Sequence, residues 1–434
     1  MTISNEIIDL ALLSFVLFQL VIFFSFHVFG YKGIHYGIMV DAGSAGTRAH
    51  VFSWDSNDKY PHVKPYPDWH KGAVIKSHTP LAKAAADENA IPNIFHGIIE
   101  KVSKIIPAEF LPKTKMYIYA TAGLRMLSIT SQGEIIENTF HYLSENSPFK
   151  ILRKNVRIMS GAEEAIYGWI SVQHLLNRTE PTCGSIDMGG ASIQVAFETK
   201  EKKNLHRILL NGKAYTIFGT SMLGLGVNQA MKRILHLNKN PCFPSGYITE
   251  SIEGTGSFEK CQDLIKSIDI IPRDVSNETR SIRNFYGMAS FYYTNEFFGL
   301  IENSTIDQLI SSTVDFCSSN WTYLNKKYNS NPFLKNYCFF GSFQSTFLSD
   351  GFGFDFSRSF VVKSGMLNGA ELSWAIGAMM KEVNSAKVDP YYIPSYMPII
   401  EMNLFVFLCF VIHYLKLKIK GKNGFLSTRT SKLL

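Results

Sequence analysis

The chain has few cysteines and few charged residues for its length. Only six of its 434 residues are Cys, and Asp, Glu, Lys and Arg together make up 18%. Hydrophobic residues make up 46%. This composition excludes a disordered chain, a coiled coil and a small scaffold held together by disulfides. It leaves a globular protein of at most about three domains, at roughly 150 residues each.

Several catalytic signatures are also missing. The sequence contains no G-x-x-x-x-G-K-[ST] loop, no H-E-x-x-H, no G-x-S-x-G and no C-x-x-C, and its 12 His are scattered. These motifs mark the common phosphate loops, zinc hydrolases, serine hydrolases and redox dithiols. A zinc site and a serine nucleophile are therefore disfavoured.

The positive charge is concentrated at one end of the chain. The net charge is +7, and the final segment contributes most of it without any acidic residue. Its basic residues are Lys416, Lys418, Lys420, Lys422, Arg429 and Lys432. Little net charge remains elsewhere, so no basic face for nucleic acid is expected.

Residues 10–29 form an apolar run that is long enough to cross about 30 Å of hydrocarbon as a helix. A cleaved signal peptide is the alternative. However, Glu6 and Asp9 stand where such a peptide carries positive charge, and no small-x-small cleavage site follows the run. We expect an uncleaved anchor here.

A second span is expected at residues 396–415. Its apolar stretch is short, but the basic tail that follows is typical of the cytosolic side of a membrane. Residues 1–9 and 416–434 would then be cytosolic, and the middle of the chain would face a lumen or the cell exterior. All the N-glycosylation sequons lie in that middle part, at Asn177, Asn277, Asn303 and Asn320.

Such a compartment permits disulfides. Pairs Cys242–Cys261 and Cys317–Cys338 would each close a short loop, while Cys409 falls in the second expected span. Cys183 is left over, and we expect it to be buried and reduced.

One motif occurs twice. An apolar run leads into Asp41-Ala-Gly-Ser-Ala-Gly-Thr-Arg48 and then an alternating segment, and the same order recurs around Asp187-Met-Gly-Gly-Ala-Ser192. Each copy reads as strand, Asp-x-Gly turn, strand. The copies lie about one domain length apart, roughly 150 residues, which suggests a duplicated domain that holds a ligand between its halves. Two ordinary Gly-rich hairpins are the alternative.

The chemistry of the paired turns suits phosphate. Glycines let successive backbone N–H groups point into one concavity, which binds phosphate oxygens. A carboxylate beside it supplies the hard oxygen that Mg²⁺ or Ca²⁺ requires. A further alternating segment, 115–120, ends at Thr121 and Gly123, which bring a hydroxyl and a glycine N–H to the same kind of site. By composition alone, that segment end reads as a plain turn.

Ser160-Gly-Ala-Glu163 matches a capping box at the start of a helix that runs towards Leu176. Because Glu163 bonds back to the cap, Glu164 is expected to be free and to serve as a general base. Gly168 and Ser171 follow on its face, which we expect to be open to a ligand. A solvated Glu in a first helical turn is the alternative.

These segments resemble the apyrase conserved regions of the nucleoside triphosphate diphosphohydrolases, over about residues 37–380. The matching segments, in order, are Asp41–Arg48, Ala120–Arg125, Ser160–Glu164 with Tyr167–Trp169, Asp187–Gln194, Phe285–Tyr293, Asp350–Phe354 and Trp374–Gly377. The resemblance implies an α/β fold of two ribonuclease H-like lobes in the actin-like superfamily, here with N- and C-terminal transmembrane helices. We assign residues 31–157 plus 366–394 to lobe I and 158–365 to lobe II.

The resemblance also implies roles for single residues. Glu164 is similar to the family's catalytic base, and Ser192 and Gln194 to the residues that hold the attacking water. Asp41 and Asp187 resemble the pair that holds Mg²⁺ or Ca²⁺. The implied phosphate cradle consists of Ser44, Ala45, Gly46, Thr47, Thr121, Gly190 and Ala191.

The implied activity is hydrolysis of nucleoside di- or triphosphates. The first motif and the few cysteines resemble the diphosphate-preferring members of the secretory pathway, which favours a UDPase/GDPase in the Golgi or ER lumen. A cell-surface apyrase that acts on ATP and ADP is the alternative. A sugar kinase or chaperone ATPase of the same superfamily and a catalytically silent receptor are more distant possibilities. The sequence determines neither the oligomeric state nor the nucleobase, although aromatic residues around Phe291 and Tyr292 are candidates for stacking.

Overall fold

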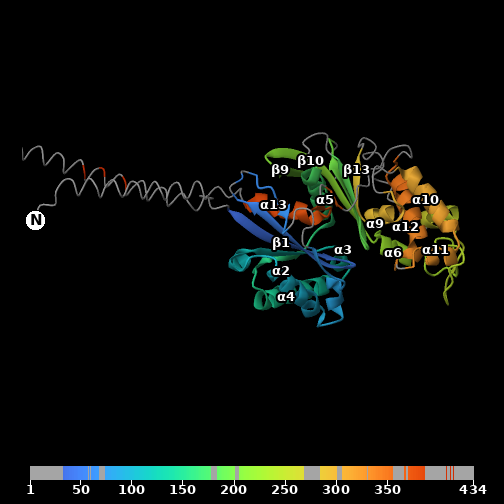
Figure 1. Cartoon of the computed structure of the whole chain (residues 1–434), viewed down its shortest axis with the longest axis horizontal. Helices are drawn as coiled ribbons and strands as arrows, with labels where there is room; N and C mark the ends of the chain where they lie inside the picture. Colours follow the sequence, from blue (N-terminus) through green and yellow to red (C-terminus); the bar gives the residue numbers. More distant parts are fainter. Residues whose placement is uncertain are drawn as a thin grey trace, which may run out of the picture. The chain divides into compact units, whose positions relative to one another are not determined.

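The computed structural model describes most of the chain between the two expected spans. The described residues are 33–56, 58, 60–67, 74–176, 183–200, 205–267, 284–300, 305–329, 331–354, 366–367, 370–386, 407, 411 and 414. Contacts divide the chain into two compact units, Met1–Asn384 and Ser385–Leu434. Both large sheets and the candidate site lie in the first unit (Figure 1).

The membrane spans expected at 10–29 and 396–415 lie outside the described residues, apart from three isolated positions. The same holds for the terminal segments 1–9 and 416–434 and for the sequon asparagines at 177, 277 and 303. Among the residues that are described, no helix combines the length and the apolar character needed to cross a bilayer.

The first sheet has the strand order β3-β2-β1-β5-β6, with β4 also paired to β2. Its strands are β1 (Ile34–Gly43), β2 (Gly46–Asp55), β3 (Lys64–Pro65), β4 (Val74–Ser77), β5 (Lys115–Ala120) and β6 (Lys150–Ile158). β1 and β2 form an antiparallel hairpin, whereas β1, β5 and β6 run parallel. The strand expected at 115–120 is confirmed. The first hairpin is tighter than expected, because only Ser44 and Ala45 lie between its strands.

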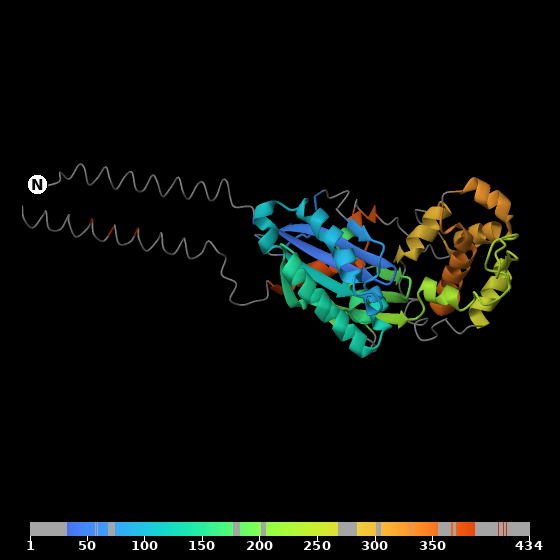
Figure 2. The same cartoon turned by 90° about the horizontal axis from the view of Figure 1, so that it is seen from below.

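Helices cover this sheet with apolar faces. Figure 2 shows α2 (Ala90–Ser103) and α4 (Ile129–Asn146) side by side, and they contact one another as well as strands of the sheet. Their buried Ile and Phe side chains join the apolar side chains of β1, β2 and β5 in one core. The short elements nearby are η1 (Leu81–Ala85), η2 (Ala108–Lys113) and α3 (Ala122–Arg125).

The second sheet has the order β13-β7-β8-β10-β9. Its strands are β7 (Gly184–Met188), β8 (Ser192–Glu198), β9 (Leu205–Leu210), β10 (Lys213–Leu223) and β13 (Phe285–Ala289). β7 forms an antiparallel hairpin with β8 and runs parallel to β13, just as β1 does with β2 and β5. The repeated strand, turn and strand expected from the sequence are therefore present in both sheets.

Two helices connect the sheets. The helix α5 (Gly161–Leu176) contacts β7, β8 and β10, and α13 (Trp374–Ala386) packs with it in one apolar core that includes side chains of both sheets. This core holds α5, and with it the expected base, in a fixed position between the two repeats. The assignment of residues to lobes I and II stays a prediction.

The remaining described elements form a largely helical part with its own aromatic core. They are α6 (Val227–Lys232), β11 (Lys239–Asn240), β12 (Glu253–Gly254), α7 (Phe258–Ser267), α9 (Ser290–Phe297), α10 (Ile306–Ser318), α11 (Trp321–Lys327), η3 (Leu334–Asn336), α12 (Tyr337–Thr346) and η4 (Phe347–Gly351). The short hairpin of β14 (Met366–Leu367) and β15 (Ala370–Glu371) lies apart from it, and Leu367 packs in the core that α5 and α13 share. Both expected disulfides, Cys242–Cys261 and Cys317–Cys338, are formed in the largely helical part. Cys183 forms no disulfide in the described part of the chain and is buried, as expected.

Candidate active site

The start of α5 has the expected capping box. The Ser160 hydroxyl accepts from the backbone N–H of Glu163 at 3.2 Å, and the Glu163 carboxylate accepts from the backbone N–H of Ser160 at 2.9 Å. Arg157 forms an ion pair with Glu163 at 3.0 Å. These bonds satisfy the first backbone donors of the helix and hold its first turn, from which Glu164 projects.

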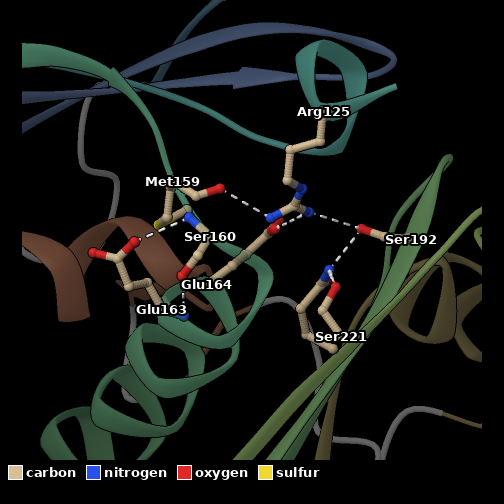
Figure 3. Close-up of polar contacts among 8 residues, drawn as sticks. Arg125, Met159, Ser160, Glu163, Glu164, Ser192 and Ser221 are labelled. Atoms are coloured by element: carbon tan, nitrogen blue, oxygen red, sulfur yellow. Dashed lines mark hydrogen bonds and ion pairs between the residues drawn. The ribbon is translucent and has the colours of Figure 1, made fainter. Parts of the chain in front are cut away.

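Glu164 is not free, contrary to the expectation from the sequence. Its side chain is buried, and Arg125 of α3 donates to its Oε2 at 2.7 Å (Figure 3). A buried carboxylate needs a partner because burial removes its hydration. The same Arg125 donates from Nη1 to the carbonyl of Met159 at 3.0 Å, which fixes the guanidinium against the start of α5.

Burial raises the pKa of Glu164 to about 8. The neighbouring Arg125 charge lowers this pKa, whereas the carboxylates of Asp187 and Asp41 raise it further. An acid whose pKa is shifted towards neutrality by burial and by specific charges has the properties of a general base.

Ser192 and Gln194 lie at the start of β8, next to this pair. Arg125 Nη2 also reaches Ser192 Oγ at 3.4 Å, and Gln194 Nε2 donates to the same hydroxyl at 2.6 Å (Figure 3). Gln194 Nε2 further donates to Ser221 Oγ of β10 at 2.8 Å. The structure therefore brings the three expected catalytic side chains into one hydrogen-bonded group around Arg125.

Asp41 and Asp187 occupy equivalent places in the two repeats. Each lies near the end of its strand and pairs across its hairpin, Asp41 with Arg48 and Asp187 with Gln194. The Arg48 guanidinium lies 3.7 Å from Asp41 and lowers the pKa of Asp187, which burial nevertheless raises to about 6.

This donor set fits a hard divalent cation. Both Asp carboxylates raise the pKa of one buried group, Glu164, so the two repeats direct negative charge towards the same place. Within the described part of the chain, no group of three or more His, Cys, Asp and Glu side chains is arranged to hold a metal. A cation held by two carboxylates with water and phosphate oxygens is the arrangement that Mg²⁺ prefers.

The two Gly-containing turns approach each other closely. A Cβ on Gly190 would lie 3.1 Å from Ser44 Oγ, and a Cβ on Gly123 would lie 3.1 Å from Ser44 Cα. The first hairpin, α3 and the second hairpin thus converge at Ser44. Thr121 lies at this junction and is buried, with its backbone N–H bonded to the carbonyl of Ala42.

Two members of the expected phosphate cradle also contact β4 and the segment after it, and their place in the cradle stays a prediction. The Thr47 hydroxyl is buried and donates to the carbonyl of Thr79 at 3.1 Å. Gly46 packs against β4, where a Cβ would lie 2.7 Å from the carbonyl oxygen of Ser77. The close approach of the two turns supports one part of the cradle. This part consists of Ser44 and Ala45 in the first turn and of Gly190 and Ala191 in the second.

The small residues of α5 do not face a ligand, contrary to expectation. A Cβ on Gly168 would lie 2.9 Å from the Met288 methyl group, and Ser171 accepts from the backbone N–H of Gly377 in α13 at 2.9 Å. This face is covered by packing with β13 and α13. Small residues were needed there because the elements approach closely.

Sequence reasoning assigned no role to three residues at this site, Arg125, Arg48 and Ser221. Both arginines lie inside the apyrase-like motifs. The available signal for their role was that a buried carboxylate nearby needs a positively charged partner. Ser221 has no local signal, because only strand pairing brings it opposite Gln194. Phe291, a candidate for base stacking, is fully buried in the core.

The sequence matches the GDA1/CD39 (nucleoside phosphatase) family over residues 29–395. The nucleoside-triphosphatase ntp-1 of Caenorhabditis elegans is 28% identical over 82% of this chain and 75% of its own length. The Golgi apyrase of Schizosaccharomyces pombe is 28% identical over 73% and 67%, respectively. Human ectonucleoside triphosphate diphosphohydrolase 3 is 26% identical over 85% and 81%.

Solved structures share the fold. A nucleoside triphosphate hydrolase of Neospora caninum superposes with a TM-score of 0.57 at 14% identity, over 82% of this chain and 93% of that chain. The Ppx/GppA family member of Aquifex aeolicus has a TM-score of 0.50 at 13% identity, over 81% and 99%. These neighbours support the actin-like fold class expected from the sequence, with mixed sheets and flanking helices.

Proposed function

Because the chain belongs to the GDA1/CD39 (nucleoside phosphatase) family and hydrolyses nucleotide phosphoanhydrides, we propose that its substrates are the nucleoside diphosphates UDP and GDP. The products are the nucleoside monophosphate and phosphate. The compartment we propose is the lumen of the secretory pathway, where the enzyme removes the diphosphate released by glycosyltransferases.

The observation that carries the hydrolytic part of the proposal is the buried group of Glu164, Arg125, Ser192 and Gln194, beside Asp41 and Asp187. Glu164 takes a proton from the attacking water, and Ser192 and Gln194 hold that water for attack on the terminal phosphorus. The turns at Ser44 and Gly190 donate backbone N–H groups to the phosphates. In phosphoryl transfer, such positioning and charge stabilisation provide most of the catalysis.

Asp41 and Asp187 would hold Mg²⁺ or Ca²⁺. A bound cation would supply positive charge that offsets the negative charge of the phosphate oxygens. The positive charge of Arg48 offsets the negative charge of the two carboxylates. Its guanidinium lies 3.7 Å from Asp41, and it lowers the pKa of Asp187.

The relatives support two substrate classes. Nucleoside-diphosphatase mig-23 of Caenorhabditis elegans and the fission-yeast Golgi apyrase favour the lumenal diphosphatase, and the lumenal role agrees with the two disulfides. The human ectonucleoside triphosphate diphosphohydrolase favours the alternative, a cell-surface apyrase that acts on ATP and ADP.

Initial rates of phosphate release by the purified full chain separate these two. We would compare UDP, GDP, ADP, UTP and ATP, each with Mg²⁺ and with Ca²⁺. Faster release from UDP and GDP than from ATP is the expected result. Equal or faster hydrolysis of ATP would overturn the lumenal proposal and favour the cell-surface apyrase.

A further inference from the structure

Ser221 has no role so far, yet it contacts the group proposed to hold the attacking water. It pairs directly with Gln194 across the antiparallel strands β10 and β8. Side chains at directly opposed positions of such a pair lie on the same face of the sheet. Gln194 Nε2 donates to Ser221 Oγ at 2.8 Å and to Ser192 Oγ at 2.6 Å, and both serines are drawn in Figure 3.

These two bonds determine which atom of Gln194 can meet a water. A primary amide nitrogen has two N–H groups, and here one goes to each serine. The carbonyl oxygen Oε1 is the remaining polar atom of the amide, and it can only accept. Gln194 in this orientation can therefore bind a hydrogen of the attacking water but cannot donate to it.

The Ser192 hydroxyl has the opposite polarity. Its oxygen accepts from Gln194 Nε2 and, at 3.4 Å, from Arg125 Nη2. A hydroxyl oxygen has two acceptor positions and one hydrogen, so this hydrogen is the part left to donate. A water that gives its hydrogens to Glu164 and Gln194 and accepts from Ser192 keeps one lone pair for phosphorus.

The first residue of α5 confines Ser221. A Cβ placed on Gly161 would lie 2.2 Å from Ser221 Cβ and 2.5 Å from its Oγ, so only glycine allows this approach. The helix start that positions Glu164 thus also packs against the serine that anchors Gln194. The start of α5 therefore helps to position both Glu164 and the amide of Gln194.

We propose that Ser221 is a positioning residue, which fixes the amide of Gln194 so that its carbonyl oxygen faces the attacking water. This inference rests on the proposed function, because it assumes that Gln194 holds the nucleophile. Without the Ser221 hydroxyl, the amide loses one of its two anchors and can turn its N–H groups to the water. A donated N–H would occupy the lone pair that attack on phosphorus requires.

Ser221→Ala is the direct test. We expect kcat for UDP hydrolysis to fall about 10-fold while KM changes less than about 2-fold, because the loss falls on the chemical step. Thr220→Ala removes a hydroxyl from the adjacent position of β10, which points to the other face of the sheet, and should leave kcat within about 2-fold. Melting temperatures of both variants show whether the fold is retained.

A double-mutant cycle with Gln194→Ala distinguishes positioning from a general structural effect. If Ser221 acts through Gln194, Ser221→Ala should change kcat of the Gln194→Ala enzyme by less than about 2-fold. An unchanged kcat in the single variant, or an equal loss in both backgrounds, would overturn the inference. A Gln194→Ala enzyme as active as the wild type would instead show that the proposed role of Gln194 is wrong.

Discussion

The protonation state of Glu164 depends on the groups around it. Burial and the carboxylates of Asp187 and Asp41 favour its protonated form, and Arg125 favours its ionised form. A base acts only when it is ionised, so the balance between these groups sets the pH at which the site becomes active.

Removing Arg125 should change the pH dependence of activity. With burial and both Asp carboxylates retained, Arg125→Ala raises the pKa of Glu164 above its value of about 8. The rising limb of kcat/KM therefore moves to higher pH, and activity at pH 7 falls about 10-fold for every pH unit that the limb moves. Profiles of kcat/KM between pH 5 and pH 10 would measure this movement.

Two further variants act as controls. Arg125→Lys keeps a positive charge and should move the limb less than Arg125→Ala. Arg153→Ala removes an arginine that pairs with Glu137 on the surface at 2.6 Å, and should leave the limb in place. A limb that does not move in Arg125→Ala would show that the ion pair does not control the base.

For single residues, the features that depend on a local sequence motif were predicted correctly. Ser160 and Glu163 form the capping box that their spacing indicates, and Asp41 and Asp187 lie at matching strand ends. The state of Glu164 was not predictable, because its partner Arg125 lies 39 positions away in the sequence. Thr47 was assigned to the phosphates from its motif, but its burial depends on the position of β4, which the motif does not encode.

At the scale of elements, the site depends on how closely α5 and α13 pack. The backbone N–H of Gly377 donates to Ser171, and a Cβ at position 377 would lie 2.0 Å from the carbonyl oxygen of Tyr167. The nearest obstructing atom belongs to the backbone of α5, so it cannot move aside as the end of a flexible side chain could.

Gly377→Ala should therefore destabilise the protein by about 1–3 kcal/mol, the usual cost of overpacking a core. Gly97→Ala in α2 is the matched control, since a Cβ there meets nothing within 4 Å. That change should stabilise by about 0.5–1 kcal/mol, because alanine favours the helix. Urea unfolding of both variants tests the contrast, and equal effects would contradict this view of the α5–α13 contact.

The elements near the motifs were predicted better than their surroundings. The strand at 115–120 and the helix to Leu176 have the bounds that hydrophobic pattern and capping indicate. The α5 face with small residues was wrongly predicted to be open to a ligand. Small residues occur both where a ligand binds and where another element packs closely, so the pattern does not separate the two. Only the positions of β13 and α13, which lie more than 100 residues later in the sequence, distinguish them.

At the scale of the whole molecule, the repeat was predictable and the arrangement around it was not. Two Asp-x-Gly turns in the same order indicated a duplicated fold, and both hairpins have the same pairing with a parallel third strand. The convergence of the turns at Ser44 and Gly190 depends on the core that α5 and α13 form with both sheets, which no local pattern describes.

The expected membrane topology predicts glycosylation at Asn320. Its side chain caps α11 by accepting from the backbone N–H of Thr322, and the residue is exposed. Thr322→Val removes the sequon but keeps the capping asparagine. In a eukaryotic membrane expression system, this variant should lose one endoglycosidase-sensitive shift on a gel. A wild-type chain without any such sugar would contradict a lumenal or extracellular middle segment.

The central claim is that Glu164 activates water for the hydrolysis of nucleotides. Glu164→Gln keeps the size of the side chain but cannot take the proton, so kcat should fall about 10²–10⁴-fold while the affinity for UDP with Mg²⁺ stays near that of the wild type. Glu163→Gln is the control, because Gln retains the capping bond to Ser160. Phosphate release and calorimetric titration of both variants, made side by side, give the answer: near-normal turnover by Glu164→Gln would contradict the account.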